Sequence, residues 1–273
     1  MCGTCGCQTS NHDHHDHDHH HDHHHDHHDH DHNHDHDHTH NSIHNSIHDE
    51  ERIERNIAVE RDILERNNNI AERVRGYLDA KEIIALNLMS SPGSGKTALL
   101  EKTLSMLKER VHAYVIEGDQ FSNNDADRIA VGGTPVIQIN TGNGCHLESE
   151  MVYKALRELN PVDHSLLFIE NVGNLVCPAM FDLGENLRVV LISTTEGEDK
   201  PIKYPNMFHD ASVCIINKTD LTPYLDISLD KLRDNILKIN PRIRIFETSA
   251  TKGNGMEDWI EFLMGMIEQT NSK

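Results

Sequence analysis

The sequence predicts an α/β fold, in which a mostly parallel sheet is flanked by helices on both faces and preceded by a tail with no core of its own. Strand-length apolar runs alternate with amphipathic helical segments after residue 80, which is typical of parallel strands joined by covering helices. About 225 residues follow the tail, enough for one domain with a substantial core. We therefore expect a tail over residues 1–49, a helical segment over 50–80 and the main domain over 81–273.

Metal-ligand side chains dominate the tail. Twenty of the 24 histidines lie in the tract from His12 to His48, interleaved with aspartates and with no apolar residue before Ile43. Such a segment buries too little surface to offset its ordering entropy, so we expect disorder. Imidazole suits nickel, zinc and copper, so the tract is expected to bind several divalent ions weakly and exchangeably. The alternative is an affinity tag or a polar linker, although the interleaved aspartates argue against a tag.

A second kind of metal site precedes this tract. Cys2, Cys5 and Cys7 fall within one short loop, close to the amine of the chain. Nickel (Ni²⁺) accepts a square-planar set of sulfur and nitrogen donors, whereas zinc (Zn²⁺) prefers a tetrahedron that so short a loop closes less easily. We therefore expect tight nickel binding here, with a redox-active CxxC pair as the alternative.

Charge and hydropathy argue against two classes of partner. The formal net charge is −20, and without the nine aspartates from Asp13 to Asp37 the chain keeps 36 acidic against 25 basic residues, or −11. Nucleic acid is therefore not an expected partner. No apolar stretch approaches the roughly 18 residues of a membrane span, and no leader pattern opens the chain. We expect a cytoplasmic protein that does not bind membranes and whose cysteines are ligands or buried groups.

The folded part is expected to begin with a helix. From Asp49 to Ala80 apolar residues follow helical spacing, with an expected break near Asn67-Asn68-Asn69. We expect this helix to pack against the main domain, with partner binding as the alternative. Strands are then predicted over 83–90, 113–117, 135–140, 165–170, 188–193, 213–217 and 243–248, and helices over 96–109, 147–159, 229–239 and 256–269.

A phosphate loop follows the first predicted strand. The run Ser90-Ser91-Pro92-Gly93-Ser94-Gly95-Lys96-Thr97 matches the pattern GxxxxGK[ST], except that serine replaces the first glycine. Its backbone N–H groups are expected to point at phosphate oxygens at the positive end of a helix. Lys96 would reach the β- and γ-phosphates, and the Thr97 hydroxyl would bind Mg²⁺. The predicted nucleotide-binding residues here are Gly93, Ser94, Gly95, Lys96, Thr97 and Ala98.

The base is predicted to be guanine. Asn217-Lys218-Thr219-Asp220 ends an apolar strand. The Asp220 carboxylate can accept from N1–H and from the exocyclic amine of guanine, and adenine offers neither donor there. Lys218 is expected to lie over the base, and Ser249 and Ala250 to support the guanine oxygen. GTP with Mg²⁺ is therefore the expected nucleotide.

Residues that sense the γ-phosphate are predicted between these motifs. Asp119 and Glu170 end two predicted strands, where their carboxylates would face Mg²⁺, and the N–H of Gly173 would reach the γ-phosphate. No residue is identifiable as the one that orients the attacking water, so we expect slow turnover unless a partner completes the site. The predicted catalytic residues are Lys96, Thr97, Asp119 and Glu170, and the predicted switches are residues 120–128 (first switch) and 171–178 (second switch).

Three further ligand-type residues lie near the switches. Cys145-His146 follows a predicted strand, and Cys177 lies within the second switch. Such a set suits zinc or nickel, and a second copy of the chain is expected to supply the missing ligands and make the metal a dimer bridge. Alternatively, both cysteines are buried apolar residues. Structural rather than metal-binding roles are expected for Cys214, His112, His164 and His209.

The chain resembles the HypB family of hydrogenase nickel-incorporation GTPases, of the SIMIBI class of P-loop proteins. The resemblance rests on the cysteine triplet, the histidine tract and residues 87–97, 144–147, 170–178 and 217–220. It implies a homodimer that depends on nucleotide and metal. It also implies nickel at Cys2, Cys5 and Cys7, and nickel or zinc at Cys145, His146 and Cys177.

The resemblance further implies a function. Such proteins use GTP hydrolysis to time the delivery of nickel to the large-subunit precursor of [NiFe]-hydrogenase. Their partners are a HypA-type zinc and nickel protein and, in some organisms, a SlyD-type prolyl isomerase. The presence of both a cysteine triplet and a histidine tract predicts combined storage and delivery. Because GTP would order the loop that holds Cys177, nucleotide and metal affinities are expected to be linked.

Two alternatives compete with this function. A urease accessory GTPase also has a His-rich start and a phosphate loop, but it usually carries a Cys-Pro-His triplet that is absent here. A nickel storage protein with a purely regulatory nucleotide site would show no GTP hydrolysis.

Overall fold

The computed structural model describes residues 41–120 and 124–270. The chain divides into two units, residues 1–61 and 62–273. The second unit contains the whole sheet and the candidate site described below.

Seven parallel strands form one sheet within the described residues, in the order β3-β2-β4-β1-β5-β6-β7. The predicted fold class is therefore confirmed. Because β1 lies at the centre and the chain winds from it to both edges, the carboxyl ends of the central strands form the expected ligand-binding crevice. The strands are β1 (Ile84–Ser90), β2 (Ala113–Asp119), β3 (Val136–Asn140), β4 (Leu166–Glu170), β5 (Leu187–Ser193), β6 (Val213–Asn217) and β7 (Arg244–Glu247).

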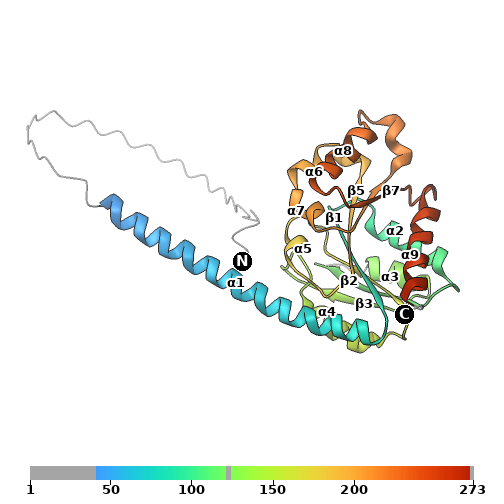
Figure 1. Cartoon of the computed structure of the whole chain (residues 1–273), viewed down its shortest axis with the longest axis horizontal. Coiled ribbons are helices and arrows are strands. Elements are labelled where there is room, and N and C mark those ends of the chain that lie inside the picture. Colours follow the sequence, from blue (N-terminus) through green and yellow to red (C-terminus); the bar gives the residue numbers. More distant parts are fainter. Residues whose placement is uncertain (1–40, 121–123, 271–273) are drawn as a thin grey trace, which may run out of the picture. The chain divides into compact units, whose positions relative to one another are not determined.

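Helices cover both faces of this sheet (Figure 1). One face packs against α2, α3 and α9 around Phe168 and Trp259, and the other packs against α4, α7, α8 and the C-terminal part of α1. No helix in the described parts of the chain is long and apolar enough to cross a membrane. The helices are α1 (Asn41–Ala80), α2 (Lys96–Leu107), α3 (Asn124–Val131), α4 (Ser149–Leu159), α5 (Cys177–Met180), α6 (Lys200–Lys203), α7 (Pro205–His209), α8 (Leu229–Ile239) and α9 (Met256–Thr270), with 3₁₀ turns η1 (Thr194–Glu196) and η2 (Thr219–Tyr224).

Helix α1 continues without a break through the asparagine triplet, so the predicted interruption at 67–69 is wrong. The reason is tertiary: the buried Asn67 side chain donates to the Asp182 carbonyl at 2.7 Å and accepts from the Ser149 amide at 2.9 Å. These bonds replace the turn-forming contacts that asparagine makes in isolated peptides. Farther along, Val74 and Leu78 are fully buried, as expected for a helix that packs against the domain. The helix begins at Asn41, before the predicted start at Asp49.

Several short helices were not predicted. α3 occupies much of the segment that was expected to be the loop of the first switch, and α5 lies at the end of the second. α6 and α7 follow β5. Helices of four or five residues are too short to show a helical period in the sequence.

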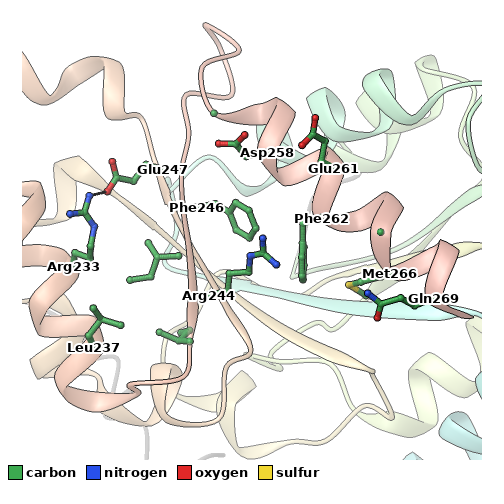
Figure 2. Close-up of a pocket in the computed structure, with 14 residues that line it drawn as sticks. Arg233, Leu237, Arg244, Phe246, Glu247, Asp258, Glu261, Phe262, Met266 and Gln269 are labelled. Carbon is green, nitrogen blue, oxygen red and sulfur yellow. Dashed lines mark hydrogen bonds and ion pairs between the residues drawn. The ribbon is translucent and has the colours of Figure 1, made fainter.

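The edge strand β7 borders a groove of about 960 Å³ between α8 and α9 (Figure 2). The guanidinium of Arg244 lies 5.3 Å from the ring centre of Phe246 and 4.7 Å from that of Phe262. On the opposite wall Arg233 of α8 bonds to Glu247. These contacts connect β7 to α8 and α9 and so stabilise the edge of the sheet.

Candidate nucleotide and metal site

The phosphate loop connects β1 to α2, as predicted. Gly93 and Gly95 have φ angles of +77° and +93°, which side chains rarely tolerate. A Cβ atom at Gly95 would lie 2.7 Å from Nδ2 of Asn217. This glycine therefore allows both the turn of the loop and the close approach of the base-recognition motif.

A cleft of about 460 Å³ opens at this loop. It brings together the phosphate loop, Asp119 at the end of β2 and Gly173 of the second switch, which the sequence predicted separately. A Cβ atom at Gly173 would lie 3.3 Å from Pro92, so the second switch closely approaches the phosphate loop. Arg128 and Asp125 of α3 complete the wall on the side of the first switch.

Glu170 bonds to the side chains of Lys96 and Thr97, the two predicted catalytic residues of the phosphate loop. Its Oε1 accepts from Lys96 Nζ at 2.8 Å and from the Thr97 hydroxyl at 2.7 Å, and that hydroxyl also lies 3.0 Å from Asp125 Oδ2. Glu170 is fully buried, and its Oε2 has no hydrogen-bond partner among the described residues. A hydroxyl beside carboxylate oxygens, one of them unsatisfied, is the ligand chemistry that Mg²⁺ prefers, so the residues fit the expected ion. Asp125 was missed because only its position on α3 distinguishes it from the other acidic residues.

A further carboxyl group, Glu117, lies in the same region. It is buried, two residues before Asp119 in β2. Burial, together with the neighbouring Glu170 carboxylate, raises the pKa of Glu117 to about 8. Asp119 instead lines the open cleft and accepts the Gln120 amide at 2.8 Å. Sequence reasoning missed Glu117, whose only signal was a charged residue inside an apolar strand.

The predicted base-recognition motif is bonded directly to the phosphate loop. Asn217 donates to the Ser94 carbonyl at 3.1 Å and accepts from the Ala250 amide at 3.1 Å. Lys218 Nζ donates to the Gly93 carbonyl at 2.7 Å. The loop, the end of β6 and the end of β7 therefore form one connected unit.

Asp220 lies in the turn η2, and its Oδ1 accepts from the Ser249 hydroxyl at 2.6 Å. Ser249 is buried and the carboxylate is half-buried. Ser249 therefore fixes the orientation of the Asp220 carboxylate, a role beyond the backbone contact expected of it.

The predicted residues Cys145, His146 and Cys177 lie together, and we call them the metal cluster. The sulfur atoms of Cys145 and Cys177 are 2.7 Å apart, and the Cys145 sulfur is 3.6 Å from Nδ1 of His146. One ligand atom from each residue lies within 4.8 Å of the others. No disulfide joins the two cysteines, and Cys177 is buried. The structure thus brings the loop after β3 and the second switch to one point.

The surroundings of His146 favour its neutral imidazole form, which is the form that binds a metal ion. Its ring stacks on Phe181 with 3.8 Å between ring centres, and burial lowers the pKa of His146. Its Nε2 is buried and accepts or donates no hydrogen bond within the described part of the chain. An imidazole nitrogen within 4.8 Å of two thiol sulfurs fits a nickel or zinc ion, with at least one coordination position left for another ligand.

The remaining histidines and cysteines of the described region are separate from this cluster. Cys214 is fully buried in β6, which confirms its structural role. His164 pairs with Glu82 and His209 with Asp210, both at the surface, and His112 is exposed. Cys2, Cys5, Cys7 and the histidine tract up to residue 40 lie outside the described residues, and the side chains of α1 are described only from Ile57 onward.

Comparison with known proteins decides the family. The model of the CobW/HypB/UreG nucleotide-binding domain matches residues 84–247. The hydrogenase maturation factor HypB of Escherichia coli K12 is 53% identical over 209 residues, which cover 77% of this chain and 72% of that protein. The chain belongs to the HypB family. The probable hydrogenase maturation factor HypB of Methanocaldococcus jannaschii is 38% identical over 211 residues, covering 77% of this chain and 96% of that protein.

Solved HypB structures share the fold. HypB from Archaeoglobus fulgidus superposes with a TM-score of 0.71 at 40% identity, covering 75% of this chain and all of that one. HypB from Helicobacter pylori, solved in complex with nickel, gives 0.70 at 37% identity and covers 75% of this chain and 96% of that one. The predicted family is therefore confirmed, and the matched nucleotide-binding domain contains the phosphate loop, the second switch and the metal cluster.

Proposed function

We propose that this HypB-family chain is a GTP-hydrolysing nickel metallochaperone that helps deliver nickel to the large-subunit precursor of [NiFe]-hydrogenase. One observation carries the proposal: the segment that starts at Glu170, in contact with Lys96 and Thr97, reaches Cys177 of the metal cluster seven residues later. Nucleotide and metal therefore act on the two ends of one short segment.

GTP binding would rearrange the ion pair between Lys96 and Glu170. Lys96 exchanges Glu170 for β- and γ-phosphate oxygens, and Asp220 accepts from the guanine edge. Thr97, Asp119 and Glu170, with Asp125 nearby, would hold Mg²⁺, which neutralises phosphate charge when bound. No side chain in the cleft is assigned to orient the attacking water. Slow turnover therefore follows, until a second copy of the chain or another protein completes the site.

Nickel is the cargo. The thiolates of Cys145 and Cys177 with the His146 imidazole offer three ligands, and a second copy of the chain would supply the remainder, so zinc or nickel would bridge a homodimer. Cys2, Cys5 and Cys7 would bind nickel tightly, and the tract from His12 to His48 would serve as a weak reservoir.

Delivery would take place in the cytoplasm and involve other proteins. A HypA-type zinc and nickel protein would exchange metal with the chain, and a SlyD-type prolyl isomerase would assist. The hydrogenase large-subunit precursor would be the final acceptor. The role of the relatives as hydrogenase maturation factors supports the hydrogenase precursor as acceptor.

Nickel affinity measured under two nucleotide states tests the proposal. Full-length protein and a truncation that starts at Ser46 are each titrated with GDP and with a non-hydrolysable GTP analogue. The truncation should keep a nucleotide-dependent site, because the metal cluster stays intact, and should lose most of the weak binding capacity. A Cys177→Ala variant should still bind GTP while its nickel affinity stops responding to nucleotide. Equal nickel affinities in both nucleotide states of the parent would contradict the proposal.

The histidine tract also supports pure nickel storage, with the nucleotide site regulating assembly only. GTP turnover separates the two functions. Delivery predicts hydrolysis that a Lys96→Ala change abolishes, together with loss of hydrogenase maturation, whereas storage predicts neither effect.

A further inference from the structure

One buried amide contacts the backbones of both functional loops. Asn171 directly follows β4 and is 1% exposed, and its own amide donates to the Leu88 carbonyl of β1 at 3.0 Å. Its side-chain Oδ1 accepts from the Leu147 amide at 3.1 Å and from the Val172 amide at 3.0 Å. Leu147 follows His146, and Val172 precedes Gly173. A single oxygen atom therefore links the loop of the metal cluster to the second switch.

The amide nitrogen of the Asn171 side chain starts a series of hydrogen bonds that crosses β1. Asn171 Nδ2 donates to Asn87 Oδ1 at 3.2 Å, and Asn87 Nδ2 donates to Glu185 Oε1 at 3.2 Å. Glu185 also accepts from Arg188 Nε at 2.8 Å. All of these groups except Arg188 are buried, so each depends on its protein partner.

This chain of hydrogen bonds, which we call the relay, ends on the protein segment that begins at Cys177. Arg188 donates to the carbonyl of Ala179 at 3.0 Å and to that of Phe181 at 3.4 Å. Ala179 belongs to α5, which begins at Cys177, and Phe181 stacks on His146. The chain of bonds from Leu147 through Asn171 to Arg188 therefore supports both protein segments that supply the metal ligands.

Side-chain packing reinforces the same link. Leu147 is fully buried, and a Cβ atom at Gly118 would lie 2.7 Å from its Cγ. Gly118 lies between Glu117 and Asp119 at the rim of the nucleotide cleft. Leu147 therefore packs closely against the end of β2, which borders the predicted nucleotide cleft.

We propose that Asn171 is a positioning residue that transmits the nucleotide state to the metal cluster. A change at Gly173 on binding of the γ-phosphate moves Val172, and the shared oxygen of Asn171 passes this change to Leu147 and so to the setting of His146. The inference rests on the proposed function, because it names the residue through which that site is regulated. If Asn171 had only a structural role, its removal would lower the stability of the fold and leave the coupling between nucleotide and metal unaltered.

The test measures coupling in the full-length chain. Cys2, Cys5 and Cys7 are replaced by serine in every arm, so that the sulfur-to-cobalt charge-transfer absorption reports Cys145 and Cys177 alone. Cobalt(II) affinity is measured with GDP and with a non-hydrolysable GTP analogue, and the ratio of the two affinities is the coupling. Coupling between sites commonly spans about 5- to 150-fold.

Asn171→Ala should bring this ratio to within about twofold of one, while cobalt and each nucleotide still bind. Asn235→Ala is the matched control, since Asn235 is also buried and donates one hydrogen bond, to the Glu198 carbonyl at 2.9 Å, away from both loops. It should lose stability and keep the ratio of the parent.

An unchanged ratio in Asn171→Ala would overturn the inference and leave the proposed function standing. A parent with no coupling would instead contradict the proposed function itself. Where Asn171→Ala does not fold, Asn171→Leu takes its place, because it keeps the volume of the side chain without the shared oxygen, and the same two outcomes apply. Thermal unfolding of each variant separates stability from coupling.

Discussion

The sulfur atoms of Cys145 and Cys177 lie 2.7 Å apart, although 32 residues separate them in the chain. Cys145 belongs to the loop after β3, and Cys177 begins α5 at the end of the second switch. An ion that binds both sulfurs therefore ties the loop after β3 to the second switch, which also approaches the phosphate loop at Gly173.

Removal of one of these thiols should weaken metal binding strongly. In the background that lacks the three N-terminal cysteines, Cys177→Ser should lower cobalt(II) affinity at least about tenfold and reduce the charge-transfer absorption, because a hydroxyl is a poor ligand for a soft site. Cys214→Ser is the control, since Cys214 lies in β6 outside the cluster. Equal spectra for the parent and Cys177→Ser would show that the metal binds elsewhere.

The choice of base should follow the Asp220 side chain. Asp220→Asn replaces one acceptor oxygen with an amide donor, which suits the C2 carbonyl of xanthine and opposes the C2 amine of guanine. The dissociation constant for GTP should rise roughly a hundredfold, and that for xanthosine triphosphate should fall. Ser249→Ala, which only releases the carboxylate, should weaken GTP binding much less. Unaltered preference for GTP in Asp220→Asn would place guanine recognition on other residues.

The buried asparagine of α1 should contribute to stability. Asn67→Ala leaves the Ser149 amide and the Asp182 carbonyl without their partners, which costs about 1–3 kcal/mol of unfolding free energy. Urea unfolding of the apo protein measures the loss. The neighbouring Asn68 is exposed, so Asn68→Ala should change stability by less than about 0.5 kcal/mol. Equal effects of the two substitutions would mean that helix propensity, and not the buried bonds, controls this segment.

The thiol of Cys214 should resist alkylation at alkaline pH. Burial raises the pKa of Cys214, so the folded protein keeps a neutral thiol at pH values where an ordinary cysteine, with a pKa of about 8.5, ionises. The raised folded-state pKa stabilises the folded protein fully below about pH 8.5 and less as the pH rises above it. Iodoacetamide at pH 9 followed by mass spectrometry should label Cys145 in metal-free protein and Cys214 only after unfolding. Labelling of Cys214 in the folded protein would show that β6 opens readily.

Sequence motifs predicted the parts of the site that local chemistry encodes. The phosphate loop, Asn217 to Asp220 and Glu170 carry their signals in neighbouring residues, and each lies at the carboxyl end of its predicted strand. Asp125 and Glu117 could not be recognised in this way. Their roles depend on contacts with Thr97 and Glu170, and those contacts form only when distant segments pack.

The same reason explains the incorrect break in α1. Asparagine triplets disfavour helix in isolation, but Asn67 bonds to residues that follow it by 82 and 115 positions. The relay through Asn87, Glu185 and Arg188 was equally invisible, since its first bond spans 98 positions. Sequence periodicity indicates which face of a helix or strand is buried. It does not indicate which polar group from a distant segment will bond to that face.

The contact between Leu147 and Gly118 limits how this protein could be redesigned. A designer who wished to change the preferred metal would naturally exchange residues 144–147 as a cassette. Any larger side chain at position 147 would push the end of β2, and any side chain at position 118 would meet Leu147 at 2.7 Å. On the proposed function, metal preference and nucleotide response are therefore not independent in this chain, and a retargeted variant would have to be selected for both properties at once.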